Sequence, residues 1–536
     1  MKSMKDAYIA RQRLRLAQGG LSRRQFMTSM MAAGVVVPTA MGWANQAAAA
    51  TPNRGGSFKM GLGHGSTTDS LDPATYENGF MTNVAYMYGN SLTEVAPDGT
   101  LVGDLVTGWE ASADAATWRM PLVSGLEFHN AKSVTAEDVI ASLNYHRGED
   151  SKSAAKGNLA SVTDISADGN TLVFTLSEGN ADFPFLVSDY HFLVMPSVDG
   201  AIDPTSGVGT GPYMIETFEA GVRALGKRNP NYHKSDRAHF EDVELLSILD
   251  VTARQNALMN GAVHAIDRVD PKTAALMGRA PNARLLEKTG TLHYAMPMRV
   301  DQAPFDNYDL RMALKLSVKR QELVDKILLG HGALGNDHPI STANRYHAAG
   351  LEQREFDAEK AAFHYKKSGH SGTIQLSSSD AAFAGAVDAA QLIAASAAEV
   401  GIDIEVVREP ADGYWSNVWN KKGWSASYWG GRPTEDWMFS SAYVASTEWN
   451  DTAWRETDGA VKFNEIVTQA RSELDETKRA ALYFEAQRLI NDDGGALIPM
   501  FANYIMGISN EIATSDDVAA NWEMDGSKAA ERWWMA

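Results

Sequence analysis

The feature that most constrains the fold is a strand–helix–strand pattern in the C-terminal half of the chain. Residues 372–377 have the composition of a strand, 383–400 that of an alanine-rich helix ending at Gly401, and 402–407 that of a second strand. Two strands joined by a helix at this spacing pair in parallel through a crossover connection. Ligands bind such units at the strand ends. The pattern therefore predicts an α/β architecture whose loops open toward a binding site.

The N-terminal half has a different pattern, which is typical of mixed α and β structure. Apolar residues alternate with polar or small ones over 118–122 and 172–176, and this period of two predicts short strands. Residues 138–145 are expected to form a helix that begins with a capping box between Thr135 and Asp138.

The first fifty residues (1–50) have the composition of an export signal. A basic stretch leads to a twin arginine, Arg23-Arg24, then to an apolar run of small residues, 27–40, and finally to four alanines that end at Ala50. The twin arginine before an apolar run resembles a Tat signal. The run is too short and too often interrupted by glycine and proline to remain in a bilayer. We expect a Tat-type signal peptide that is cleaved near Ala50.

Charge and cysteine content exclude several classes of protein. The chain has 48 basic and 67 acidic residues, a formal charge of −19, and removal of a leader with seven basic residues and one acidic residue makes it −25. Such a surface repels nucleic acid and anionic membranes. With no cysteine, the chain has no disulfide, thiolate–metal site or lipidated cysteine. We therefore expect a soluble periplasmic protein of two or more lobes, neither bound to nucleic acid nor embedded in a membrane.

Several sequence blocks occur in an order that is characteristic of one family. They are GLEFHNAKSVTAEDV (125–139), GTGPY (209–213) followed by RNPNY (228–232), PFDNYDLRMAL (304–314) and FDAEKA (356–361). These blocks resemble the family 5 extracellular solute-binding proteins, which serve dipeptide, oligopeptide and nickel importers. The resemblance covers nearly all of the chain after the leader.

The resemblance implies a fold and a function. The fold is a two-lobe periplasmic binding protein of type II that closes at a hinge, with lobe I at 51–294 and 502–536, an extra subdomain inserted at about 92–206, and lobe II at 295–501. The function is capture of a small molecule, a peptide or amino-acid derivative, for an ABC permease pair with its ATPases. We expect a monomer that is not an enzyme and uses no cofactor.

An unusual concentration of aromatic residues lies at 414–454, which holds seven of the thirteen tryptophans. An aromatic-lined cleft supplies apolar area, stacking faces and a site for a cation. The candidate binding residues here are Tyr428, Trp415, Trp419, Trp429 and Trp437. Core packing is the alternative for any single tryptophan, whereas the cluster coincides with the family's ligand loop.

Within this segment, residues 428–437 (YWGGRPTEDW) occupy the place of that ligand loop. Peptide binders of the family have an aspartate there, which takes the ligand's α-ammonium group. Here Arg432 stands at that position, after Gly431, and Asp436 lies further on. An arginine suits a carboxylate or phosphate instead. Two hypotheses follow: either Asp436 binds the amine in a shifted alignment, or the ligand presents an anion to Arg432.

A second departure from the family involves Asp380. Dipeptide binders have an arginine shortly before the lobe II helix, and residues 377–383 contain none. The positions that bind the ligand's carboxylate and amine would then be exchanged. Arg432 would bind the carboxylate and Asp380 the amine of a zwitterion. A structural salt bridge between Arg432 and an aspartate is the alternative. An amino-acid conjugate or opine fits this site as well as a dipeptide does.

In the other lobe, His64, Ser66 and Thr67 follow the first strand and are expected to face the cleft. Their hydroxyl and backbone amide groups suit polar parts of a ligand. An ordinary loop with Asx-type turns is the alternative.

An enzyme is the first competing function. The patterns Ser153-x-x-Lys156, Ser188-Asp189-Tyr190 and Lys288-Thr289-Gly290 occur in the order found in serine β-lactamases. Such short patterns arise easily by chance. The nucleophilic serine should open a buried helix, whereas Ser153 lies in a polar stretch.

A nickel- or haem-binding protein of the same fold is the second competing function. His347, His364 and His370 have neither an H-E-x-x-H pattern nor an i, i+4 pair. We therefore assign no metal ligands.

Overall fold

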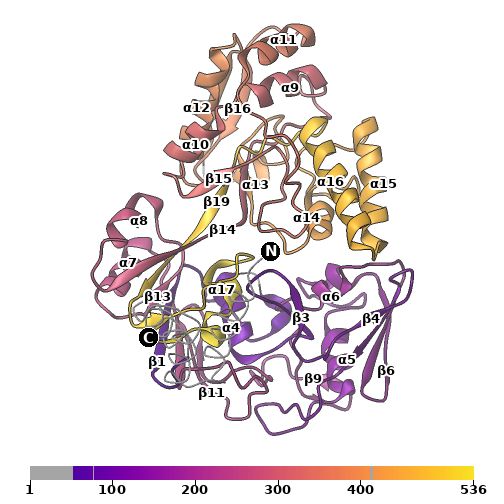
Figure 1. Cartoon of the computed structure of the whole chain (residues 1–536), viewed down its shortest axis with the longest axis vertical. Helices are drawn as coiled ribbons and strands as arrows, with labels where there is room; N and C mark the ends of the chain where they lie inside the picture. Colours follow the sequence, from indigo (N-terminus) through magenta and orange to yellow (C-terminus); the bar gives the residue numbers. More distant parts are fainter. Residues whose placement is uncertain (1–51, 77, 411–413) are drawn as a thin grey trace, which may run out of the picture.

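The computed structural model describes residues 52–76, 78–410 and 414–536. The expected signal peptide at 1–50 lies outside the described residues. The rest of the chain forms two lobes, one above the other in Figure 1, each with hydrophobic cores of its own.

A nine-stranded sheet, counted over the described residues, is the backbone of the lower lobe, which we call lobe I, and extends into the upper one, lobe II. Its strands, in order across the sheet, are β10 (Tyr213–Glu219), β11 (Arg223–Arg228), β12 (Asp242–Ser247), β1 (Ser57–Leu62), β13 (Ala265–Ile266), β19 (Met500–Ser509), β14 (Ala283–Ala295) and β18 (Ser427–Trp429), with β15 (Gly332–Leu334) also paired to β19. Helix α4 (Gly79–Tyr88) contributes to the main core of lobe I, in which Phe58 and Phe240 stack at 4.5 Å. Helices α7 (Val251–Met259), α8 (Pro271–Met277), α17 (Glu523–Ser527) and α18 (Ala529–Arg532) and the short strands β20 (Ile512–Ala513) and β21 (Trp534–Met535) complete this part.

Two long antiparallel strands, β14 and β19, run between the lobes (Figure 1). Their ladder extends from Ala283 opposite Ser509 to Tyr294 opposite Met500, and it is interrupted between Thr289 and His293. Because an interruption of this kind loosens and bends a ladder, it is the place where the strand pair can flex.

A separate four-stranded sheet with its own core lies at the right of lobe I in Figure 1. It consists of β4 (Glu110–Ala111), β5 (Thr117–Pro121), β7 (Thr171–Leu176) and β6 (Val162–Asp168), together with helices α5 (Ala136–Tyr145) and α6 (Phe183–Leu186) and the hairpins β2–β3 (Thr93–Val95, Leu101–Gly103) and β8–β9 (Ser197–Val198, Ala201–Ile202). Both alternating segments are strands, as the period of two predicted, and Trp118 pairs with Phe174 across them. The capping box of Thr135 and Asp138 is also present, so these three predictions are confirmed.

The crossover predicted in the C-terminal half is confirmed in lobe II. Strands β16 (Ile374–Ser378) and β17 (Ile404–Arg408) pair in parallel and are joined by α12 (Ala386–Ala398). The helix begins later than expected because Gly385, with φ +82°, has left-handed backbone geometry that a helix cannot include.

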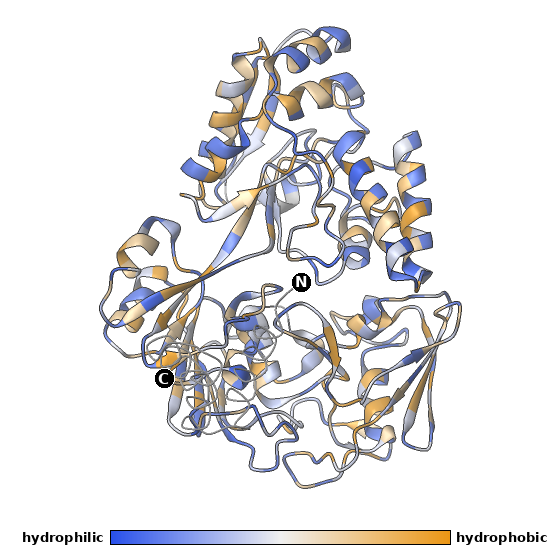
Figure 2. Ribbon diagram, viewed as in Figure 1, coloured by the Kyte–Doolittle hydropathy of each residue, from blue (hydrophilic) through white to orange (hydrophobic). Residues whose placement is uncertain are grey.

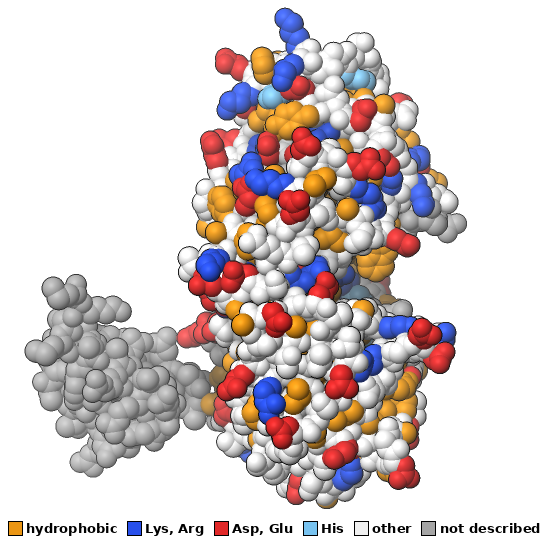
Figure 3. All heavy atoms as spheres, turned by 90° about the vertical axis from the view of Figure 1, so that its right-hand side faces the viewer, with side chains coloured by type: hydrophobic (Ala, Val, Ile, Leu, Met, Phe, Trp, Pro, Cys, Tyr) orange, Lys and Arg blue, Asp and Glu red, His pale blue; other side chains and the backbone are white. Residues whose placement is uncertain are grey.

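The remaining helices of lobe II pack around two cores. They are α9 (Tyr308–Leu316), α10 (Arg320–Lys326), α11 (Ala358–Ser368), α13 (Tyr414–Asn417), α14 (Glu435–Ala442), α15 (Asp458–Ser472) and α16 (Glu476–Asp492). Figure 2 shows that these helices carry hydrophilic and hydrophobic residues in alternation along their ribbons, as amphipathic helices do. No helix in the described ranges is long and apolar enough to cross a membrane. On the face shown in Figure 3, acidic and basic side chains are interspersed over both lobes.

Candidate functional site

Two adjoining cavities lie between the lobes, beside the segment that corresponds to the expected ligand loop. The larger, of about 170 Å³, is lined from lobe I by Val95–Gly99, Asp182, Phe185, Ala520 and Asn521, from lobe II by Thr342–Tyr346 and Pro433–Glu435, and from β14 by Thr291. The smaller cavity shares Val95, Pro433 and Asn521 with it and adds Trp437 and Lys528. Because both lobes contribute to the walls, a molecule held here would be enclosed when the lobes close.

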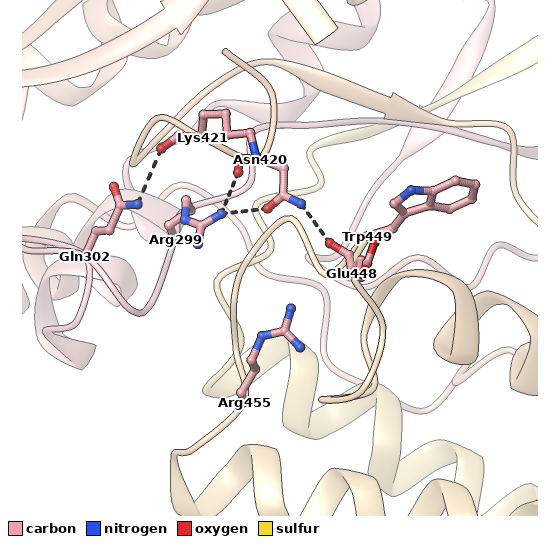
Figure 4. Close-up of a pocket in the computed structure, with 7 residues that line it drawn as sticks. All are labelled: Arg299, Gln302, Asn420, Lys421, Glu448, Trp449 and Arg455. Atoms are coloured by element: carbon pink, nitrogen blue, oxygen red, sulfur yellow. Dashed lines mark hydrogen bonds between the residues drawn. The ribbon is translucent and has the colours of Figure 1, made fainter. Parts of the chain in front are cut away.

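A larger cavity of about 610 Å³ lies in lobe II alone (Figure 4). Its polar side chains are engaged with one another: Arg299 donates to the Asn420 side chain at 2.6 Å, and Asn420 donates to the carbonyl of Glu448 at 2.9 Å. Its walls thus hold the loops of lobe II together. We place the candidate site in the interlobe cleft instead, because both lobes contribute to the walls of the cavities there.

The candidate ligand loop is built by β18 and the start of α14. β18 pairs with β14, placing Trp429 opposite His293, and Thr434 caps α14 through the backbone N–H of Trp437. Gly431 has φ +74°, and a Cβ atom there would lie 2.2 Å from the Thr291 side chain. Gly431 is therefore required by the backbone path and by the close approach to β14. Its role is to shape the loop.

Arg432 is a half-buried cation without a carboxylate partner among the described residues. Its guanidinium group donates to the carbonyl of Gly431 at 2.7 Å and lies over the Trp429 ring, 5.9 Å from the ring centroid. Burial lowers the pKa of Arg432, and Tyr190 and Asp189 of lobe I partly offset this effect. The structural salt bridge considered as an alternative is not formed with any described acid. A desolvated guanidinium group with free donors is suited to an incoming anion.

The acidic candidates lie elsewhere. Asp436 is buried and accepts hydrogen bonds from Arg471 at 3.1 and 3.3 Å, so its carboxylate already has a cationic partner. Asp380 is exposed next to α12, where it accepts from the N–H of Val387 at 3.5 Å, and it forms no ion pair with Arg432. The structure therefore does not bring Arg432 and Asp380 together as a pair.

The tryptophans of the aromatic segment divide between core and surface. Trp419 and Trp429 pack edge to face at 6.3 Å, and their indole N–H groups donate to the same carboxylate, that of Asp451, at 3.0 and 3.1 Å. Trp424 and Trp454 are fully buried core residues. For these two the core-packing alternative is the better description.

The other aromatic candidates are more accessible. Tyr428 is 44% exposed, and Trp437 lines the smaller interlobe cavity. The side chain of Trp415 lies outside the described residues. Trp437 thus offers an aromatic surface to a molecule in the cleft, whereas Tyr428 is exposed without lining either cavity.

The lobe I candidates form a compact turn. Asp69 accepts from the N–H of Ser66 at 2.8 Å, and the hydroxyls of Ser66 and Thr68 meet at 2.7 Å, while Thr67 is exposed. This is the Asx-type loop that was the alternative for this segment. Burial, together with Arg268 and Arg254, lowers the pKa of His64 to about 4, so His64 is neutral at physiological pH.

His347, His364 and the Ser153-x-x-Lys156 pattern have other partners in the described structure than a metal or a hydrolase centre would require. His347 and His364 bond to the carbonyl of Ile340 and the carboxylate of Asp309, respectively, and within the described ranges no group of acidic or histidine side chains could hold a metal ion. Ser153 is buried and contacts His146 at 2.7 Å. Lys156, its expected partner, instead donates to the carbonyl of Glu149 at 2.8 Å.

Several cavity residues have no local sequence signal. Asp182, Asn344 and Asn521 come from three distant parts of the chain, and Asn344 supports the ligand loop by donating to the carbonyl of Arg432 at 3.2 Å. Their neighbours form no motif, so only the tertiary structure identifies them.

A buried acid at the cavity leads to a pH prediction. Glu435 accepts from the N–H of Tyr346 at 2.7 Å, and burial raises the pKa of Glu435 from 4.5 to about 7. The neutral Glu435 side chain therefore contributes its full stabilisation of the fold below pH 4.5, and this contribution is lost as the pH rises through 7. Between pH 5 and pH 8 the ionisation of Glu435 should cost the wild-type protein about 2–3 kcal/mol of its free energy of unfolding. Glu435→Gln keeps the hydrogen-bond acceptor and the shape but cannot ionise, so it should not show this loss. Urea unfolding of both proteins at several pH values measures this difference.

The comparison between wild type and variant is needed because other groups titrate in the same range. Burial also raises the pKa values of Asp436 and Asp451, each to about 6, while those of the buried histidines His146 and His293 are lowered to about 4 and act in the opposite sense. Parallel stability curves for the two proteins would show that Glu435 is not the source of the pH dependence.

Comparison with known proteins agrees with this architecture. Residues 100–451 match the family described as bacterial extracellular solute-binding proteins, family 5 Middle. Among curated relatives, the probable D,D-dipeptide-binding periplasmic protein DdpA of Escherichia coli is 24% identical over 84% of this chain and 90% of its own length. The glutathione-binding protein GsiB of Salmonella typhi is 24% identical over 80% and 85%.

Solved structures show the same fold. The PBP AgaA of A. tumefaciens in complex with agropinic acid superposes with a TM-score of 0.70 at 19% identity, over 90% of this chain and 99% of that one. The substrate-binding protein CtaP of Listeria monocytogenes has a TM-score of 0.77 at 17% identity, over 90% and 100%. From its sequence match, its two lobes and its interlobe cleft, this chain belongs to the family 5 extracellular solute-binding proteins.

Proposed function

We propose that this protein is the periplasmic substrate-binding component of an ABC importer and captures a small peptide-like or zwitterionic amino-acid-derived solute by lobe closure. The family match, the paired strands β14 and β19 between the lobes and the cavities between the lobes support this function. In this mechanism the open form binds the solute on one lobe, the other lobe then excludes water, and the closed form docks on the permease pair.

The observation that carries the proposal is the unpaired cation Arg432. Two acids at the cleft already have cationic partners: Asp436 binds Arg471, and Asp182 lies 2.7 Å from Arg479. Arg432 adjoins the cavity-lining Pro433 and has no carboxylate partner among the described residues, so it would select a carboxylate. Trp437 would supply contact area. A dipeptide, an amino-acid conjugate or an opine carries such a carboxylate.

We also propose the division of the chain that this mechanism needs. Lobe I comprises 51–294 and 502–536, with an inserted subdomain at about 92–206, and lobe II comprises 295–501. The interrupted ladder between Thr289 and His293 supports a hinge near these boundaries. The protein would act as a monomer that docks in its closed form on the permease pair, which works with its ATPases.

Native mass spectrometry of the gently purified protein tests this function first. A thermal-shift screen of dipeptides, amino-acid conjugates, opines, betaines and nickel then separates the ligand classes. We expect a bound small molecule, or a rise in Tm with one carboxylate-bearing class. A response to nickel alone would favour a metal carrier, and no ligand with no shift in any class would contradict the proposal.

Export through the Tat pathway is a further part of the proposal. Replacing both arginines of the pair, Arg23→Lys and Arg24→Lys, should leave the precursor uncleaved in the cytoplasm, because the twin arginine is what distinguishes a Tat signal from a general export signal. Cell fractionation and N-terminal sequencing of the periplasmic form measure the outcome. Unchanged export of the double variant, with normal cleavage near Ala50, would show that the Tat pathway is not used.

A further inference from the structure

The lobes meet at a second place, on the side of the cleft opposite β14 and β19. In Figure 1 these strands lie at the left of the cleft, whereas α6 of the inserted subdomain lies below the ends of α15 and α16 at the right. Asp182 lies 2.7 Å from Arg479, Glu178 lies 3.3 Å from Arg471, and the backbone N–H of Ala181 donates to the carbonyl of Arg471 at 2.6 Å. One short loop of lobe I thus makes three polar contacts with lobe II.

Contacts within lobe II hold the Arg479 side chain in position. It donates to the carbonyl of Ala470 at 3.1 Å and to the hydroxyl of Tyr483 at 3.3 Å. Its guanidinium group also lies over the rings of Tyr346 and Tyr483, at 5.6 and 5.4 Å. Because all these partners belong to lobe II, they stay with Arg479 when the lobes separate, whereas Asp182 leaves with lobe I.

Arg471 connects the same contact to the candidate ligand loop. It bonds to Asp436 through Nε and donates to the hydroxyl of Ser440 at 3.0 Å, and both residues lie on α14. Asp182 also lines the 170 Å³ cavity together with Glu435. The contact between the lobes therefore borders the cavity at the side away from the hinge.

Because Asp182 and Arg479 are both buried, their contact is favourable only when both charges are present. Asp182 and Arg479 are each 3% exposed in the closed structure, whereas separated lobes would expose the Asp182 carboxylate to water. Closing over one of these charges without the other would bury an uncompensated ion, which is strongly unfavourable. The pair is thus complete only when the lobes are together.

We propose that Glu178 and Asp182 of lobe I, with Arg471 and Arg479 of lobe II, form an interlobe latch that stabilises the closed cleft through ion pairs between the lobes. The latch raises the population of the closed form, which binds ligand tightly, and so raises affinity through the equilibrium between the open and closed forms. This distinguishes it from Arg432, whose contribution depends on a carboxylate in the ligand. The latch requires no particular ligand class.

The distance between the lobes in ligand-free protein tests the latch directly. Since the chain has no cysteine, spin labels on Asp164→Cys in β6 and Glu465→Cys in α15, both exposed positions, report only the lobe separation. Double electron–electron resonance of the full mature protein should show a population at the closed distance beside that of the open form. Asp182→Asn, which keeps the shape and removes the charge, should reduce that population at least twofold and add longer distances.

Matched variants separate the latch from general effects. Glu110→Gln changes an exposed acid of the same subdomain without an ion pair in the described structure and should leave the distances unchanged. Glu178→Gln should have a smaller effect than Asp182→Asn, because the Glu178 side chain is 60% exposed, and the double variant the largest. Circular dichroism confirms that each variant is folded.

Two results would overturn the latch. The first is a wild-type protein without a closed population, and the second is a folded Asp182→Asn, Glu178→Gln double variant whose distances equal those of wild type. Because the measurement needs no ligand, neither result bears on the proposed role of Arg432, which the binding experiments test separately.

Discussion

Replacing Arg432 by alanine is expected to weaken ligand binding about 100-fold, with little change in the free energy of unfolding. A charge-assisted hydrogen bond in a closed, water-poor cleft contributes about 1.5–3 kcal/mol, and about 2.7 kcal/mol corresponds to 100-fold in Kd. Folding should tolerate the change because the guanidinium group donates only to the neighbouring Gly431 carbonyl and rests on Trp429. Isothermal titration with the compound found by the thermal-shift screen measures the loss.

Matched variants and a modified ligand make this result specific. Arg432→Lys should lie between wild type and alanine, because it keeps the charge but loses the planar fork of donors. Arg345 lines the cavity, but it is paired with Glu476 at the surface, so Arg345→Ala should change the affinity only slightly. The amide analogue of the ligand's carboxylate should bind wild type and Arg432→Ala equally. Full affinity for the unmodified ligand in Arg432→Ala would remove this residue from the site.

Replacing Glu94 by glutamine is expected to destabilise the protein by about 3–5 kcal/mol, because it removes one partner from a buried ion network. Glu94 is 3% exposed and accepts hydrogen bonds from Arg532 at 2.7 Å, Lys528 at 3.2 Å and Lys234. Asp104 and Glu531 complete the network. After the substitution, Lys234 and Lys528 would keep Asp104 and Glu531 as partners and Arg532 would keep Asp525 at 3.1 Å, but all three cations would lose the central carboxylate. Urea unfolding followed by circular dichroism measures the change.

The same network predicts acid sensitivity. Burial acts to raise the pKa of Glu94, but the surrounding Lys528, Lys234 and Arg532 hold it well below its ordinary value. Its contribution is therefore present above pH 4.5 and lost as pH falls below that value. Glu94→Gln should lose stability less steeply on acidification than wild type does.

A surface pair provides the control for Glu94. Glu219→Gln breaks an exposed pair with Arg223 and should cost less than about 1 kcal/mol. A cost of the same small size for Glu94→Gln would show that the network contributes little to stability.

The aromatic segment shows how far composition alone leads. Its seven tryptophans correctly indicated an unusual region, and the YWGGRPTEDW loop does border the interlobe cavities. Composition does not separate Trp424 and Trp454, which are core residues, from Trp437, which lines a cavity. All three are large apolar residues in one short stretch, and only packing in three dimensions decides which side chain is covered.

The charged candidates show the same limit. Loop position made Arg432 and Asp436 equally plausible ligand contacts, yet Asp436 is bound by Arg471, which comes from α15. No sequence pattern near Asp436 indicates that Arg471 is its partner. Likewise, the contact between Asp182 and Arg479 joins segments almost three hundred residues apart in the sequence.

The sequence by itself determined the family, the parallel crossover in lobe II and the capped helix α5, and it singled out the loop that borders the interlobe cavities. These depend on periodicity, caps and ordered motifs, which are properties of short segments. Only the tertiary structure decided which charges are free and which are paired, which tryptophans are buried, and where the lobes meet away from the hinge. Burial and ion pairing depend on segments that folding brings together from distant parts of the chain, and so no local pattern contains them.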